Sequence, residues 1–427
     1  MRGEAAHALG IDIGTSGLRA AVLDAAGLVL AAHGRPFAPA ERRDPAAWLA
    51  ALRTVLAGLD LARVGAVAVD GTSGTLVGLD RSGTPVGGPL MYDELEEDDA
   101  LVRRADALAP AASAARGAGS GALRALALLR RPGVVRVAHQ ADLLVAALTG
   151  RADRTDESNA LKTGYDPVGR RWPDWLERLG IDRRALPAAL PVGAPLAPVS
   201  EDAGAWGGPP AGATVAGGLT DGCASFLATG AGHVGDAVTA LGSTLTLKLL
   251  SARPVFHGPS GIYSHRIGDW WLAGGASNTG GAVLLEHYDA RSIARLSASI
   301  DPSVDAGAFY PLRRPGERFP VSDPALPPAM PNPALPPARH LHALLEGIAR
   351  VEAMGYRRLH ELGAPRPHRV LSVGGGADNA AWTAIRRRRL LAALGPVEMA
   401  AGRSTDAAMG AARVALARLH GAAVIGA

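Results

Sequence analysis

Residues 9–24, LGIDIGTSGLRAAVLD, carry the pattern that decides the fold of this chain. Leu9, Ile11 and Ile13 alternate with small or acidic residues, which predicts a strand with one apolar face. The glycine and hydroxyl residues that follow predict a tight turn into a second strand. We therefore expect a hairpin in which Asp12 lies on the face that carries the glycines.

A second stretch, residues 238–250, repeats this pattern as VTALGSTLTLKLL. An apolar strand again runs into a glycine with hydroxyl neighbours and then into an alternating strand, which indicates two related halves. Glycine lets a backbone approach phosphate oxygens, and inward-facing amides form an anion-binding nest. Either turn alone is typical of an ordinary hairpin. As a pair at equivalent places, they predict that the two halves hold a polyphosphate from both sides.

The remaining periodicity predicts an α/β protein, because strands alternate with helices along the chain. Further strands are expected at 64–69, 213–217 and 370–373, and each is followed by polar or glycine-rich residues. Helices are expected at 123–130, 138–149, 223–228 and 340–362.

Four other segments carry predictions of their own. The Gly- and Pro-rich stretch 187–210 indicates a surface excursion, and the proline-crowded stretch 311–339 indicates chain without regular structure. The run Arg386–Arg389 follows Trp382 and predicts the solvated face of a helix. The GxGxxG at 230–235 follows a helix and precedes a strand, the reverse of the dinucleotide-binding order, and is interpreted as a linker.

Composition bounds the class of protein. The 427 residues suffice for two domains at about 150 residues each. The net charge of +4 is spread along the chain, which argues against a nucleic-acid partner. A lone cysteine, Cys223, fits a reducing compartment and a small buried thiol. No apolar stretch approaches the roughly 18 residues of a membrane helix, so we expect a cytoplasmic protein without a membrane partner.

Two aspartates are candidates for chemistry. Aspartate is disfavoured inside strands, so Asp12 indicates a role such as Mg²⁺ coordination; the alternative is a carboxylate bonded to the amides of the following turn. Asp221 precedes a predicted helix and can act as its N-cap, as a catalytic group, or as both.

The chain resembles the FGGY family of carbohydrate kinases, which carry a D-x-G-T-S hairpin, a central aspartate, a second G-S-T hairpin and a Gly-Gly-Gly-x-x-N turn. These motifs appear in order at Asp12–Ser16, Asp221, Gly242–Thr244 and Gly374–Asn379. Longer blocks such as DGTSGTLVGLD and SNALKTGYDP are most similar to the D-ribulokinase-like, xylulose-kinase-like branch of plants and cyanobacteria.

The resemblance implies a two-domain, actin-like (ribonuclease H-like) α/β fold with a catalytic cleft between the domains, ATP and Mg²⁺ as cofactors, and a small sugar as substrate. Residues 1–225 would form the sugar-binding domain and 226–427 the nucleotide-binding domain. Asp221 would be the catalytic base, and Asp12 and Asp221 the metal-binding residues. The residues expected to bind ATP are Gly14, Thr15, Ser16, Gly242, Ser243, Thr244, Gly375, Gly376 and Asn379.

For the sugar, a polyol needs convergent carboxylates and hydroxyls, and the candidates are Asp12, Ser73, Asp93, Asp142 and Asp221. Asp93 is open to an exposed-loop interpretation and Asp142 to an N-cap interpretation. The resemblance implies a kinase that phosphorylates the terminal O5 of a ketopentose, with D-ribulose first and D-xylulose or another small polyol as the alternative. An ATPase of the same fold and a non-catalytic sugar sensor are two further possibilities. The sequence leaves the oligomeric state open.

Overall fold

The computed structural model describes residues 6–425, which form two compact units. The first unit holds the chain up to Ala228, together with His265–Asp269 and Asp406–Gly426. The second holds Thr229–Ser264 and Trp270–Thr405. The first crossing therefore lies close to the boundary expected after residue 225. The C-terminal segment differs from that expectation, because it packs with the first unit rather than with residues 226–405.

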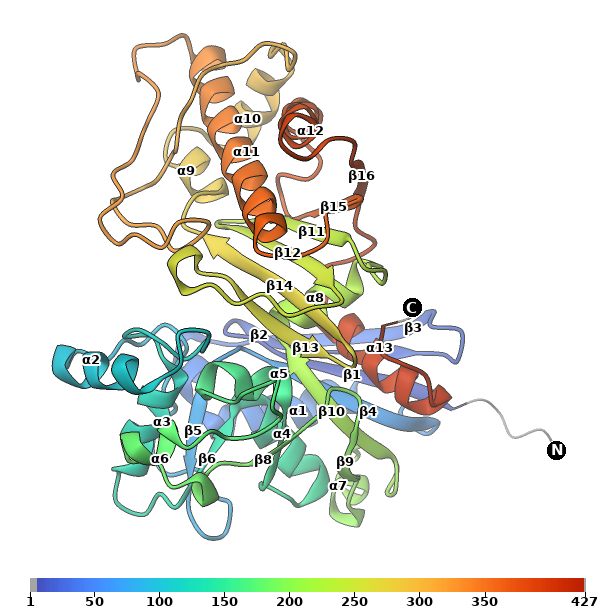
Figure 1. The fold of residues 1–427 in the computed structure, drawn as a ribbon. Helices are drawn as coiled ribbons and strands as arrows, with labels where there is room; N and C mark the ends of the chain where they lie inside the picture. Colours follow the sequence, from blue (N-terminus) through green and yellow to red (C-terminus); the bar gives the residue numbers. More distant parts are fainter. Residues whose placement is uncertain (1–5, 426–427) are drawn as a thin grey trace. The chain divides into compact units, whose positions relative to one another are not determined.

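The first unit is built on a six-stranded mixed sheet in the order β3-β2-β1-β4-β10-β9 (Figure 1). β1 pairs antiparallel with β2, and β2 with β3, whereas β1, β4 and β10 are parallel. The strands are β1 (His7–Ile13), β2 (Gly17–Leu23), β3 (Val29–Pro36), β4 (Val64–Gly71), β9 (Pro195–Pro198) and β10 (Thr214–Thr220). The expected hairpin at residues 9–24 is confirmed.

Apolar side chains from the central strands form the core of this unit. Leu9, Ile11 and Val69 are buried together with Trp48 and Leu52 of helix α1. The helices are α1 (Pro45–Ala57), α2 (Asp99–Leu108), α3 (Gly121–Leu129), α4 (Gln140–Thr149), α5 (Glu157–Ala160), α6 (Trp175–Leu179), α7 (Glu201–Ala205), α8 (Asp221–Ala228) and α13 (Ala407–His420). Two further strand pairs are β5 (Leu76–Leu79) with β6 (Arg136–His139), and β7 (Arg154–Asp156) with β8 (Ala188–Leu190).

Helix α13 contacts β1, β2 and β4, and in Figure 1 it lies beside β1 although the two are at opposite ends of the chain. Small residues allow this approach. A Cβ added at Gly10 of β1 would lie 1.9 Å from the carbonyl oxygen of Ala408. The close fit of helix backbone on strand backbone explains why the C-terminal segment belongs to the first unit.

The stretch 187–210 corrects one expectation. It was interpreted as a surface excursion, but it contributes β8, β9 and α7. β9 pairs antiparallel with β10 and so becomes an edge strand of the main sheet, and Leu196 on it is buried. Proline is compatible with this place because an edge strand can leave some N–H positions unpaired.

The second unit repeats the same strand plan. Its sheet has the order β13-β14-β12-β11-β15-β16, and β11 pairs antiparallel with β12 but parallel with β15, as β1 does with β2 and β4. The predicted internal repeat is thus confirmed at the level of topology. The strands are β11 (Asp236–Leu241), β12 (Leu245–Ser251), β13 (Tyr263–Ile267), β14 (Trp270–Ser277), β15 (Arg369–Val373) and β16 (Glu398–Ala401).

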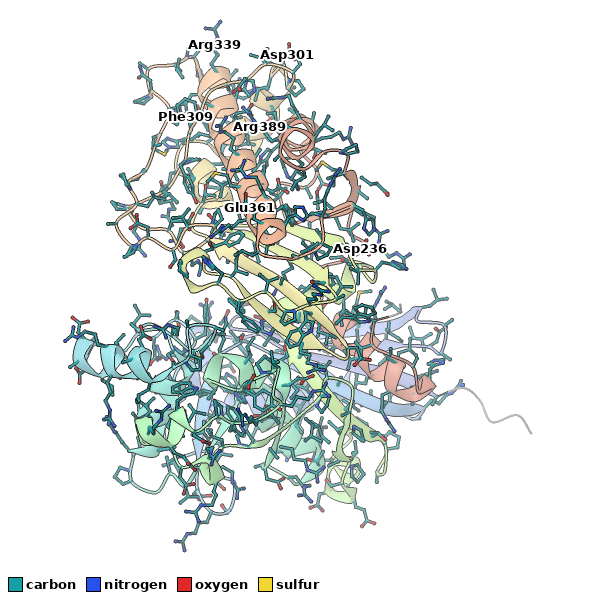
Figure 2. The ribbon with its side chains drawn as sticks, viewed as in Figure 1. Asp236, Asp301, Phe309, Arg339, Glu361 and Arg389 are labelled. Atoms are coloured by element: carbon teal, nitrogen blue, oxygen red, sulfur yellow. The ribbon has the colours of Figure 1, made fainter. Side chains whose placement is uncertain are left out.

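Helix α11 is the longest element of the second unit, with Arg339 and Glu361 near its two ends (Figure 2). Its Leu344, Leu345 and Ile348 pack in the same core as the strands. The helices are α9 (Gly281–Leu285), α10 (Ala290–Ser297), α11 (Pro337–Glu361) and α12 (Ala380–Leu394). The stretch 311–339 lacks helices and strands as far as Pro336, as expected, but residues 337–339 form the start of α11. Within the described residues, no helix is long and apolar enough to span a bilayer.

The arginine run on α12 is not the solvated face that its sequence predicted. Arg386 is fully buried and forms two hydrogen bonds with Glu352 of α11, at 2.6 and 2.7 Å. Arg388 and Arg389 both contact Glu346, also on α11. The expectation was wrong because these arginines are paired with acids that lie more than 30 residues away in the chain, and such pairs have no signature in local periodicity.

Candidate active-site residues

Three carboxylates meet at the carboxyl ends of parallel strands in the first unit. Asp12 on β1 lies directly opposite Asp70 on β4 in the strand register. Asp221 follows Thr220, which is opposite Gly71 of β4. The negative charges of Asp12 and Asp221 both act on Asp70. Because carboxyl ends of neighbouring parallel strands share one edge of a sheet, the fold gathers these three acids in one place.

Asp12 is buried and forms an ion pair with Arg19 of β2. Nε and Nη2 of Arg19 donate to Asp12 Oδ2 at 3.1 and 2.6 Å. The pairing follows from the hairpin, since Asp12 and Arg19 are register partners across β1 and β2. Asp221 is partly buried at the first position of α8, and the amide of Gly222 donates to its Oδ1 at 2.6 Å. The alternative in which Asp12 bonds only the following turn does not describe its contacts.

Asp70 is an acid that the sequence reasoning did not single out. Burial is the main cause that raises the pKa of Asp70 well above its ordinary value, and the neighbouring charge of Asp12 adds to it. The raised pKa favours the protonated form of Asp70, which limits the negative charge buried beside Asp12. The signal available in the sequence was an aspartate at the end of an otherwise apolar strand.

We expect Asp70→Asn to raise the stability of the first unit at neutral pH. A raised folded-state pKa means that the native carboxyl holds its proton more tightly than the unfolded one, so stability falls as pH rises above about 3.9 and levels off above the folded pKa. The asparagine amide resembles the protonated acid, so the variant does not lose stability as the pH rises. Urea titrations of both proteins at several pH values between 3 and 8 measure this. Identical urea unfolding curves for wild type and Asp70→Asn at neutral pH would contradict a raised pKa of Asp70.

Hydroxyl and amide groups adjoin these acids at the end of β4. The Thr72 amide donates to Gln140 Oε1 at 3.2 Å, which joins the strand end to the start of α4. The hydroxyls of Thr72 and Ser73 and the Nε2 of Gln140 are buried and have no hydrogen-bond partner among the described residues. Buried polar groups are rarely left unsatisfied, so this group of atoms marks a place where a polar ligand is expected.

The two other predicted sugar contacts have different surroundings. Asp93 is exposed in the loop after β5, and its charge acts on the buried guanidinium of Arg124. Asp142 is buried in the first turn of α4, where its Oδ2 accepts from the backbone amide of His139 and contacts His139 Nδ1, both at 2.8 Å. The capping interpretation therefore describes the contacts of Asp142.

The predicted nucleotide residues of the second unit, except Thr244, line a cavity of about 650 Å³. Gly242 and Ser243 come from the β11–β12 turn, and Gly375 and Gly376 from the turn after β15. The two turns are in contact, since a Cβ at Gly376 would lie 3.0 Å from the Leu241 side chain. The apolar wall is provided by α9, α10 and α12 through Leu284, Leu285, Ile293, Ala294, Ala298, Ala381 and Trp382. A flat apolar chamber beside glycine turns suits a nucleobase with its phosphates.

Asn379 lines this cavity as the N-cap of α12. Its Oδ1 accepts from the amide of Trp382 at 3.0 Å, and its Nδ2 donates to Ser297 Oγ at 2.8 Å. The side chain therefore fixes α10 against the start of α12, which shapes one wall. In the first unit, Thr15 and Ser16 are exposed at the β1–β2 turn, and Gly14 donates its amide to the Gly17 carbonyl at 3.0 Å.

The metal assignment was tested against the donor groups. Among the described residues no group of three or more His, Cys, Asp or Glu side chains is arranged to hold a metal by itself. Asp12 and Asp221 supply two carboxylates near one another. That donor set fits Mg²⁺, which protein sites commonly bind through one or two carboxylates with water and substrate phosphates as the other ligands.

Residues 237–419 match the C-terminal domain of the FGGY family of carbohydrate kinases. The second unit of this chain is therefore similar to the C-terminal domain of that family. The matched range begins at β11 and includes the G-S-T turn, the Gly-Gly-Gly turn and Asn379. The residues predicted to bind the nucleotide in the second unit thus lie inside the matched range.

Similarity to individual kinases extends over nearly the whole chain. A xylulose kinase from Klebsiella pneumoniae is 26 % identical over 450 residues, covering 96 % of this chain and 90 % of that protein. The structure of a xyloylose kinase from Brucella ovis matches with a TM-score of 0.84 at 22 % identity and covers 98 % of this chain and 91 % of that one. The structure of a xylulose kinase from Rhodospirillum rubrum matches with a TM-score of 0.81 at 24 % identity and covers 96 % of this chain and 89 % of that one. The expected two-domain, actin-like α/β fold is confirmed.

Proposed function

We propose that this FGGY protein transfers the γ-phosphate of ATP to a terminal hydroxyl of a ketopentose, with D-ribulose as the first candidate and O5 as the acceptor. The observation that supports it best is the edge of the first sheet. Three carboxylates lie there beside buried hydroxyls and an amide that have no hydrogen-bond partner among residues 6–425. A polyol carries several O–H groups, each of which needs an acceptor or a donor, and this collection of groups supplies both.

In this proposal Asp221 takes the proton from the attacking hydroxyl. Phosphoryl transfer passes through a loose transition state, so the protein contributes mainly by positioning the reactants and neutralising charge. The sugar is held by Asp12, Ser73, Asp93 and Asp221, and Asp142 acts through the turn that it caps. The glycine and hydroxyl turns at 14–16 and 242–244 hold the β- and γ-phosphates with backbone N–H groups. The cavity in the second unit holds the adenosine.

Mg²⁺ would be held by Asp12 and Asp221 together with phosphate oxygens. When bound, it supplies neutralisation of the phosphate charge. The ion pair with Arg19 fixes Asp12 Oδ2, which leaves Oδ1 for this role. Asp70 stays neutral beside it and prevents the repulsion that a third carboxylate would add.

D-Xylulose is the second candidate, because the relatives of known structure and sequence carry the name xylulose kinase. The two ketopentoses differ at one stereocentre, so one reoriented hydrogen bond decides between them. A sugar-independent ATPase and a sugar sensor without turnover remain the competing functions.

ADP release from Mg-ATP, measured with D-ribulose, D-xylulose, L-ribulose, L-rhamnulose, glycerol and no sugar, tests the proposal. We expect strong stimulation by D-ribulose and little by the others. Stimulation by D-xylulose alone would identify D-xylulose as the substrate and would still support a sugar kinase. Release that is independent of sugar would favour the ATPase. No release with any sugar, although ATP binds, would favour the sensor.

A further inference from the structure

Three loops of the first unit converge on one buried arginine. The loops are residues 72–75 after β4, residues 91–97 after β5, and residues 115–120 before α3. The first carries Ser73 and the second carries Asp93, two of the proposed sugar-binding residues. Neither loop contains a helix or a strand, so backbone hydrogen bonding within regular structure does not fix their positions.

Arg124 of α3 donates one hydrogen bond to each of these loops. Nε donates to the Gly74 carbonyl at 2.9 Å, Nη1 to the Glu94 carbonyl at 2.8 Å, and Nη2 to the Gly119 carbonyl at 2.9 Å. Its three nitrogens thus each bind a different loop. The residue is only 5 % exposed, so these bonds are shielded from water. Shielded bonds to a charged donor are among the strong ones.

Arginine is suited to this position by its shape. The guanidinium is a rigid plane that presents five N–H donors in fixed directions, whereas a lysine ammonium is a compact point charge on a flexible stem. Burying a cation among carbonyls is costly unless other groups offset it. Burial lowers the pKa of Arg124 to about 10, while the charge of Asp93 acts in the opposite direction. The guanidinium therefore keeps its proton at neutral pH, and the acid whose charge acts on it, Asp93, is a proposed sugar ligand.

Other contacts tie the same loops together. The Tyr92 amide donates to Thr75 Oγ1 at 3.2 Å, and the Glu96 amide donates to the Ala118 carbonyl at 2.9 Å. A Cβ at Gly74, whose φ is +90°, would meet Arg124 Nη2 at 3.0 Å, so glycine allows the close approach of the loop to the guanidinium. Loss of Arg124 would leave these weaker links as the main connections.

We propose that Arg124 is the positioning residue of the sugar site: it holds the loops that carry Ser73 and Asp93 at the spacing a ketopentose requires. This inference rests on the proposed function for its substrate, but its structural content concerns loop order alone. A residue that only stabilised the fold would affect both reactants alike. Substitution of a positioning residue changes the KM for the sugar and leaves the KM for ATP unchanged.

Arg124→Met removes the donors and keeps an apolar side chain. With the sugar that the wild-type protein phosphorylates best, we expect the KM for sugar to rise about tenfold or more, the KM for ATP to change less than about twofold, and Arg124→Lys to lie between wild type and Arg124→Met. Arg131→Met is the matched control, because Arg131 also donates to a loop carbonyl, that of Gly88, at an exposed site. It should leave both KM values unchanged.

An unchanged sugar KM in folded Arg124→Met overturns the inference, as does an equal loss for sugar and ATP. If Arg124→Met does not fold, Thr75→Val removes the acceptor of the Tyr92 amide and should raise the sugar KM about threefold with the ATP KM unchanged; no change would count against the inference. Hydrogen exchange tests the positioning role of Arg124 independently of whether the protein is a sugar kinase. Faster exchange confined to residues 72–75, 91–97 and 115–120 in Arg124→Met supports the positioning role even if no sugar is turned over, and unaltered exchange there refutes it.

Discussion

Asp221→Asn should lower turnover by a factor on the order of 10² to 10⁴ while ADP binds with wild-type affinity. The amide keeps the size of the side chain and the start of α8 but cannot accept a proton from the sugar hydroxyl. The cavity proposed to hold the nucleotide consists of residues of the second unit, so the affinity for ADP measured without Mg²⁺ should not depend on this change. Steady-state ADP release and calorimetric titration with ADP measure the two quantities.

Asp202→Asn is the matched control for this substitution. Asp202 is an exposed acid in the first turn of another helix of the same unit, α7, and its replacement should leave turnover unchanged. Normal turnover in Asp221→Asn would exclude Asp221 as the base. A loss of ADP affinity equal to the loss of turnover would show that the residue acts in nucleotide binding instead.

Gly410→Ala should destabilise the first unit by about 3 kcal/mol. A Cβ at this position of α13 would lie 1.9 Å from the Ala224 carbonyl oxygen and 2.4 Å from its carbon. Both are backbone atoms of α8, so no side-chain rotation can relieve the overlap. Alanine favours a helix over glycine by about 1 kcal/mol, which is smaller than this overpacking cost. Differential scanning calorimetry should therefore show a lower transition temperature for the first unit.

Gly204→Ala in α7 provides the comparison, since its Cβ would meet its nearest atom at 3.4 Å. The gain in helix propensity should leave that variant as stable as wild type or slightly more stable. Equal transition temperatures for Gly410→Ala and wild type would contradict the close contact of α13 with α8.

The hairpins and strand ends could be predicted from the sequence because their signals are local. Alternation over seven residues defined β1, and the glycine and hydroxyl turn that follows it is set by the conformations those residues adopt. The recurrence of this pattern at residues 238–250 predicted that the second unit would repeat the strand arrangement of the first. The places of Asp12, Asp221 and the glycine turns followed, because a polar residue at the end of a parallel strand lies at the shared edge of the sheet.

Other features depend on residues that meet only after folding. Register across β1 and β4 places Asp70 beside Asp12, 58 positions away in the sequence, and gives it a raised pKa. Glu346 and Glu352 convert the arginine run from a solvated face into buried pairs. Arg124 binds the carbonyls of three loops, the most distant of which lies 50 residues away from it in the sequence. The sequence alone determined the strand plan and the candidate chemistry, since both rest on short-range patterns. Only the tertiary structure decided which charges are paired and which loops are held, because these depend on the distances between segments remote in the chain.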